Sequence, residues 1–228
     1  MAGPWFRRSP SLLTELRKEI EAKYPDLAVS VRGEVGLLRG SFPILHDGAE
    51  LDRFQIEVFI PPDFPKRIPM VRETAGRIPH APDWHTHEKG TLCVVVPEEW
   101  LVNAAAGSIL AFLDGPLRNY FLNHALAEAG VGRSMGERSH GSDGLLEAYG
   151  ELVEEKEPAV IKRYLDYVGK EQVKGHWECP CGSGMKMRKC HFSKVLHLRT
   201  RIPVWVAKSA LQRLDSQMKR EREGVVHK

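Results

Sequence analysis

The sequence predicts an α+β fold in which one helix precedes an antiparallel sheet and further helices follow it. Three observations lead to this fold class. Apolar residues recur at helical spacing within the first 24 residues, closely spaced extended segments follow up to residue 60, and the patterns after residue 104 are mostly helical. Strands this close in sequence are joined by short turns, so we expect them to pair as an antiparallel meander.

The first helix is expected to begin at Ser9 or Ser11, because either side chain can cap it. Its apolar residues stand at positions 12, 13, 16 and 20, which share one face of a helix. The helix should run to about Tyr24, because Pro25 cannot continue it.

Three strands are expected at about residues 28–38, 40–46 and 51–60. Glycine residues, Gly36 and Gly40 among them, punctuate these segments, and Asp47-Gly48 is a strong hairpin signal. The last strand alternates apolar and polar residues from Phe54 to Ile60, as a half-buried strand does. The proline-rich segment 61–65 then stops this strand, and another extended piece begins at Ile68.

Helices are expected again at 104–113 and 117–129, broken from each other by Gly115-Pro116, and at 145–168, interrupted at Pro158. The Gly-, Arg- and Ser-rich segment 130–144 reads as a loop. A last helix at 204–223 carries alternating charges and loosely spaced apolar residues. It either packs on the rest of the chain, binds a partner, or is a solvated charged helix.

The composition indicates a protein of the cytoplasm. The net charge is +3 with 28% charged residues, too mild to indicate nucleic-acid binding. No apolar run approaches the roughly 20 residues of a membrane span, and the first eight residues lack the apolar core of a signal peptide. Three of the four cysteines lie between positions 179 and 190, which does not resemble a secreted disulfide scaffold, so we expect a reducing compartment.

Cys93 ends the polar, Gly-containing segment His85-Thr86-His87-Glu88-Lys89-Gly90-Thr91-Leu92 and is followed by Val94, Val95 and Val96. A thiol there should lie at the rim of a core with its sulfur near solvent, where a nucleophile needs to be. The alternative is a buried structural cysteine, since free cysteines are usually buried. This segment alone leaves both interpretations open.

The order of motifs around Cys93 resembles the ubiquitin-conjugating (UBC) family. Phe64-Pro65 matches the family's "P-x-x-Y/F-P" turn, Pro69-Met70-Val71 its "P-x-V" strand, and Gly90-Thr91-Leu92-Cys93 its "G-x-[IL]-C" segment. The slot of the family's His-Pro-Asn tripeptide holds Asp83-Trp84-His85, so His85 replaces the asparagine, as in divergent bacterial members. The resemblance covers about residues 10–168 and implies a UBC-like conjugating domain over residues 1–170.

This resemblance implies that Cys93 accepts a ubiquitin-like protein from an activating enzyme as a thioester and passes it to a lysine of a protein substrate. The family's asparagine serves near the oxyanion, so His85 is expected to donate a hydrogen bond there. His87 is a second candidate for this role, and His80 is expected to order the loop. A histidine that only packs the loop is the alternative for His85.

Acidic and histidine residues elsewhere are further candidates. Glu98, Glu99 and Asp114 can help to deprotonate the incoming lysine, although acidic loop residues are usually just solvated. His140 can fold back toward Cys93, whereas Trp84 is expected to pack the loop.

Two other functions remain open. A Cys-His hydrolase would use Cys93 with His85 or His140, but the sequence does not locate the Asp or Asn that would orient the base. A non-catalytic adaptor would bind a ubiquitin-like protein without reacting with it. Divergent bacterial conjugating enzymes tend to be encoded with a ubiquitin-like protein and an activating enzyme in systems resembling antiphage defence, which is the context that the resemblance implies.

A second motif is Cys179-Pro180-Cys181-Gly182-Ser183-Gly184-Met185-Lys186-Met187-Arg188-Lys189-Cys190-His191. Three cysteines and a histidine at this spacing predict a tetrahedral, structural zinc site with ligands Cys179, Cys181, Cys190 and His191. A reactive thiol cluster or a chance arrangement is the alternative. The motif resembles the SEC-C module, whose family members bind protein partners or ribosomes. We expect the zinc module at 171–196 and a helical tail at 197–228.

Overall fold

The computed structural model describes residues 3–46, 48–87, 89–103, 108–131, 139 and 141–223. The chain divides into two compact units. Unit 1 comprises Met1–Pro97 and Ala104–Glu137, and unit 2 comprises Glu98–Asn103 and Arg138–Lys228. The segment directly after the Cys93 region therefore belongs to unit 2, although it interrupts unit 1 in the sequence.

Unit 1 confirms the α+β class, because its helices pack on a four-stranded antiparallel sheet with the order β1-β2-β3-β4. The elements before and within the sheet are α1 (Trp5–Arg8), α2 (Pro10–Lys23), β1 (Leu27–Arg32), β2 (Val35–His46), β3 (Ala49–Ile60) and β4 (Met70–Glu73). His46 pairs with Ala49, so the hairpin expected at Asp47-Gly48 is confirmed, although Asp47 itself lies outside the described residues.

The strand expected at 28–38 is wrong, because a tight turn divides it. Arg32 pairs with Val35, and Gly33 between them adopts a φ of +63°, which glycine accepts readily. The break expected at Gly40 is absent. Gly40 lies within β2 opposite Leu27, where a Cβ atom would come 2.0 Å from the carbonyl oxygen of Asp26. This glycine thus marks a close backbone approach and not a strand end.

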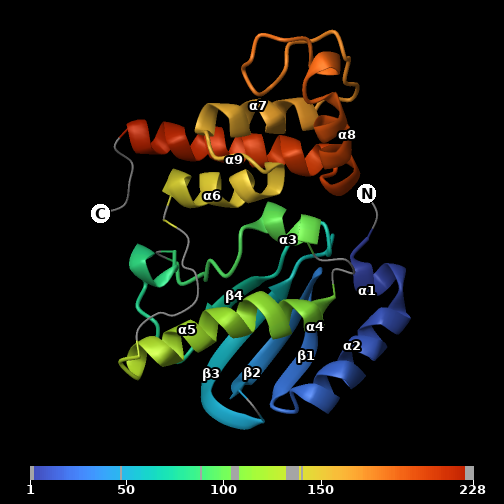
Figure 1. Ribbon diagram of the computed structural model, residues 1–228. Coiled ribbons are helices and arrows are strands. Elements are labelled where there is room, and N and C mark those ends of the chain that lie inside the picture. The colour runs from blue at the N-terminus through green and yellow to red at the C-terminus, as the bar shows by residue number, and fades with distance from the viewer. Residues whose placement is uncertain are drawn as a thin grey trace. The chain divides into compact units, whose positions relative to one another are not determined.

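Helix α5 (Arg118–Glu128) covers the sheet, and α2 lies beside β1 (Figure 1). The ring of Phe121 on α5 stacks on that of Phe54 on β3, with centroids 4.5 Å apart. From α2, Leu16 and Ile20 are buried, whereas Leu12, expected on the same apolar face, is exposed. The core of unit 1 therefore lies between its helices and one face of the sheet.

The helix break expected at Gly115-Pro116 is also wrong. Helix α4 (Ile109–Phe112) continues through a π-helical segment, η2 (Leu113–Leu117), directly into α5. A π turn widens the helix locally, and proline has no N–H to place in the regular ladder, so such a turn can accommodate Pro116. Residues 104–107 of the expected helix lie outside the described residues.

Unit 2 is helical. Its elements are α3 (Pro97–Asn103), which begins at the unit boundary, α6 (Gly141–Val153), α7 (Pro158–Val168), the short turn η3 (Met187–Lys189), α8 (Phe192–Arg201) and α9 (Val204–Arg222). Pro158 is the first residue of α7, which confirms the interruption expected there. The loop expected at 130–144 ends earlier, because α6 already begins at Gly141.

The tail helix α9 is docked within unit 2. Figure 1 shows it between α6 and α7, with the axes of the three helices roughly aligned. Val206, Ala207, Ala210 and Leu214 are its buried residues. This packing excludes the alternative of a fully solvated helix. Within the part of the chain that the structure describes, every helix falls short of the length or apolar character required to cross a bilayer.

Candidate functional site

Cys93 lies in a short two-stranded hairpin directly opposite His85. The N–H of Cys93 donates to the carbonyl oxygen of His85 at 2.7 Å, and the N–H of His87 donates to that of Thr91 at 2.9 Å. Thr86 and Leu92 form the antiparallel bridge between these two bonds. The structure therefore brings together the backbones of Cys93 and His85, which are separated by eight positions in the sequence.

Burial alternates along the Cys93 strand of the hairpin. Leu92 and its partner Thr86 are only 6% and 5% exposed, whereas Cys93 is exposed. Neighbouring side chains in a strand point to opposite faces, so the Cys93 thiol lies on the side away from the core. This accessibility is what a nucleophilic thiol requires, and it rules out the buried structural cysteine. His87 is exposed and His85 is half-buried.

Helix α5 supports the hairpin from within unit 1. The hydroxyl of Tyr120 donates to the carbonyl oxygen of Trp84 at 2.7 Å, and the Trp84 ring stacks on that of His124 with centroids 5.2 Å apart. Trp84 thus packs the loop, as the sequence predicts. Tyr120 and His124 were not found from the sequence, because their only local signal is an i, i+4 spacing on a helix.

His80 packs against the turn of the hairpin. A Cβ atom on Gly90 would come 2.8 Å from Cε1 of His80, and Gly90 has a φ of +74°. Glycine is therefore favoured at this turn both by its backbone conformation and by the neighbouring imidazole. This contact agrees with the loop-ordering role expected for His80.

The acidic candidates lie in different surroundings. Glu98 is 1% exposed in unit 2, where Tyr149, Ser209 and Arg213 donate hydrogen bonds of 2.9–3.1 Å to its carboxylate. A buried carboxylate with these partners is structural, so the expectation that Glu98 deprotonates a lysine is wrong.

Asp114 in unit 1 accepts hydrogen bonds from Lys23 at 2.6 Å and from the hydroxyl of Tyr24 at 2.5 Å. Burial, together with this hydrogen bond, raises the pKa of Tyr24. Glu99 is half-buried on α3. His140, a further candidate, lies outside the described residues.

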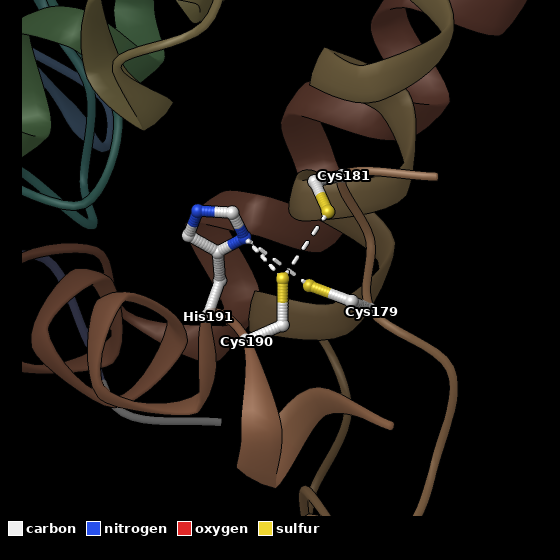
Figure 2. A group of neighbouring side chains, drawn as sticks. All are labelled: Cys179, Cys181, Cys190 and His191. Atoms are coloured by element: carbon white, nitrogen blue, oxygen red, sulfur yellow. Dashed lines mark hydrogen bonds between the residues drawn. The ribbon is translucent and has the colours of Figure 1, made fainter. Parts of the chain in front are cut away.

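Cys179, Cys181, Cys190 and His191 lie close together in unit 2 and can hold a metal ion. Figure 2 shows their sulfur atoms and the Nδ1 atom of His191 gathered around one point. Nδ1 lies 3.3 Å from Sγ of Cys179 and 3.1 Å from Sγ of Cys190, and the sulfurs of Cys181 and Cys190 are 3.6 Å apart. Sulfurs bound to one tetrahedral zinc ion at about 2.3 Å lie about 3.8 Å apart, so the 3.6 Å between the Cys181 and Cys190 sulfurs is close to the spacing in a filled site.

Local backbone geometry builds the cluster. The N–H of Cys179 donates to the carbonyl oxygen of Met185 at 2.9 Å, which closes the loop between the first two cysteines and the last two ligands. Gly182 and Gly184 have φ values of +83° and +72°, so the loop turns where other residues would be strained. The short turn η3 then ends at Lys189, and the N–H of Cys190 directly after it donates to the carbonyl oxygen of Met187 at 2.9 Å.

The thiols differ in their surroundings. Burial raises the pKa of Cys179, whereas the hydrogen bond from the Ser183 hydroxyl lowers that of Cys181. A bound divalent cation favours the thiolate at each of the three cysteines, because it adds two positive charges at the centre of the cluster.

Helix α7 holds the loop that carries the first two cysteines. Nε of Arg163 donates to the carbonyl oxygen of Pro180 at 2.7 Å, and the hydroxyl of Tyr167 donates to that of Glu178 at 2.9 Å. These two carbonyls flank Cys179 in the sequence. Arg163 and Tyr167 lie outside the Cys/His motif, and no local pattern could have identified them.

We expect Arg163→Met to weaken metal binding about tenfold or more, as the loss of partners that orient metal ligands typically does. Three thiolates around a divalent ion leave a net negative charge, and the guanidinium both offsets that charge and fixes the Pro180 carbonyl. Competition with a chromophoric chelator measures the affinity. Lys162→Met is the matched control, because Lys162 on the same helix pairs with Asp215 instead. Equal affinities for the two variants would contradict this role.

Comparison of the chain with protein-family models, with curated proteins and with solved structures finds no match. A function for this chain therefore has to be inferred from its own residues and their geometry.

Proposed function

We propose that this chain is a UBC-like acyltransferase that carries a ubiquitin-like protein as a thioester on Cys93. The observation that carries the proposal is the exposed thiol of Cys93, a residue whose backbone N–H donates to the carbonyl oxygen of His85. The elements before Cys93 also support the proposal, since a helix, a four-stranded meander and an extended loop precede the cysteine in the order of the UBC family.

The proposed reaction has two acyl transfers. The Cys93 thiolate attacks the thioester carbonyl of the ubiquitin-like protein on its activating enzyme, a new C–S bond forms, and the activating enzyme's thiolate leaves. A neutral lysine amine of the protein substrate then attacks the same carbonyl. The amide C–N bond forms, the Cys93 thiolate leaves, and the proton of the amine passes to solvent.

His85 is the proposed hydrogen-bond donor to the oxyanion that forms in both steps. The position of His85 supports this role, because the carbonyl oxygen of His85 accepts a hydrogen bond from the Cys93 N–H. A neutral imidazole can donate from one ring nitrogen, so its tautomer matters. His87, two residues further along the same strand of the hairpin, is the second candidate.

We further propose that the Cys/His cluster holds a structural zinc ion. Its support is the donor set, since thiolates and imidazole suit zinc and four protein ligands leave no position for a substrate. When bound, zinc would cross-link the loop at Cys179 and Cys181 to the start of α8.

A charging assay tests the function. The chain is mixed with a candidate ubiquitin-like protein, its activating enzyme and ATP, and the products are separated on non-reducing gels. We expect a shifted band that a thiol reductant removes and that Cys93→Ala abolishes. Cys93→Ser should give a band that resists the reductant, because an oxygen ester exchanges with thiols far more slowly.

Binding of the ubiquitin-like protein without any shifted band would instead support the adaptor. Cleavage of a ubiquitin-like fusion that depends on Cys93 would support the hydrolase. Either result would overturn the conjugating function.

A further inference from the structure

The peptide carbonyl just before His85 receives two side-chain donors. The hydroxyl of Tyr120 donates to the carbonyl oxygen of Trp84 at 2.7 Å, and Oγ1 of Thr86 donates to the same atom at 3.1 Å. Tyr120 is 8% exposed and Thr86 is 5% exposed, so both bonds are partly shielded from competing water. One point of the backbone, adjacent to the candidate oxyanion donor, is thus fixed from helix α5.

His85 needs such support because its backbone conformation is unfavourable. Its φ is +49°, a left-handed value that residues other than glycine rarely adopt. Such a conformation persists where the surrounding structure determines it. The carbonyl of His85 then accepts the Cys93 N–H, so two successive carbonyls connect Tyr120 to the strand that carries the thiol.

The ring of Tyr120 is itself fixed to the core of unit 1. It meets the ring of Phe121 edge to face, with centroids 5.3 Å apart, and Phe121 stacks on Phe54 of β3. The Tyr120 ring also lies 4.4 Å from the ring of His124, on which Trp84 stacks. The hydroxyl is therefore held by a rigid aromatic group that rests on the sheet.

We infer that Tyr120 is a positioning residue, whose hydroxyl holds His85 in register with Cys93. The inference rests on the proposed function for its catalytic consequence, but the anchoring of the hairpin can be measured independently. Tyr120→Phe removes the hydroxyl and keeps the ring contacts. The Trp84 carbonyl then loses its buried donor from α5, and the hydrogen bond between Cys93 and His85 should open more often.

Hydrogen–deuterium exchange of the Cys93 amide is the first readout. Loss of the part-buried hydrogen bond to the Trp84 carbonyl should speed exchange of the Cys93 amide about tenfold in Tyr120→Phe. Tyr24→Phe is the matched control, because it also removes one tyrosine hydroxyl bond from unit 1, the bond to Asp114, and should leave Cys93 exchange unchanged. Equal exchange of the Cys93 amide in the two variants would overturn the inference that Tyr120 anchors the hairpin.

Discharge of the Cys93 thioester to free lysine is the second readout. We expect the maximal rate to fall several-fold in Tyr120→Phe with an unchanged KM for lysine, because the geometry of the thioester changes and the access of the amine does not. An unchanged discharge rate would overturn the positioning role. The wild-type chain could form no thioester while the Cys93 amide still exchanges faster in Tyr120→Phe than in Tyr24→Phe. The proposed function would then fail, but the anchoring of the hairpin by Tyr120 would hold.

Discussion

Removal of the proposed zinc ion is expected to unfold the Cys/His segment of unit 2. Apparent binding energies of structural zinc are about 10–16 kcal/mol in small zinc-binding peptides, as large as the whole stability of many domains. Residues 176–193 should lose their protection against hydrogen exchange when a strong chelator is added, and the melting temperature should fall.

The loss of protection against hydrogen exchange should extend beyond the ligand residues. Met187, between the ligand pairs, and Val195 and Leu198, just after His191, are fully buried. The start of α8 should therefore lose protection together with the ligand loop, while β2 and β3 of unit 1 serve as the internal reference. Cys181→Ser should reproduce the effect without chelator. An unchanged metal content and an unchanged melting curve in this variant would refute the zinc assignment.

Glu98→Ala is expected to destabilise unit 2 by about 2 kcal/mol, the cost of leaving its hydrogen-bond donors, one of them buried, without their acceptor. The carboxylate accepts from the side chains of Tyr149, Ser209 and Arg213, which belong to α6 and α9. Its loss leaves the fully buried Tyr149 hydroxyl without this acceptor and separates Arg213 from its counter-charge. Urea titrations monitored by a probe in unit 2 measure the change.

Two variants control this measurement. Glu99→Ala removes the neighbouring carboxylate of the same helix, which is half-buried, and should cost much less. Arg213→Ala in the Glu98→Ala background should add little further loss, because the two residues act on one interaction. Additive losses from Glu98 and Arg213 would show that the carboxylate is not the centre of this network.

The sequence by itself determined the features that depend on neighbouring residues. The α+β class, the hairpin before Ala49, the start of α7 at Pro158 and the four-residue Cys/His cluster follow from periodicity, turn chemistry and ligand spacing. Each of these signals acts over a few positions, so it is readable without knowledge of the fold. Two assignments stay predictions that the assays above can test: the thioester on Cys93 and the zinc ion in the Cys/His cluster.

Only the tertiary structure decided what depends on contacts between distant segments. Gly40 reads as a strand end, but the approach of the Asp26 carbonyl explains its place within β2. Glu98 reads as a solvated acid until residues of α6 and α9, more than 50 positions away, surround it. Tyr120 and Arg163 carry no motif. Their roles arise because packing brings a helix against one backbone carbonyl, and such a contact leaves no periodic trace in the sequence.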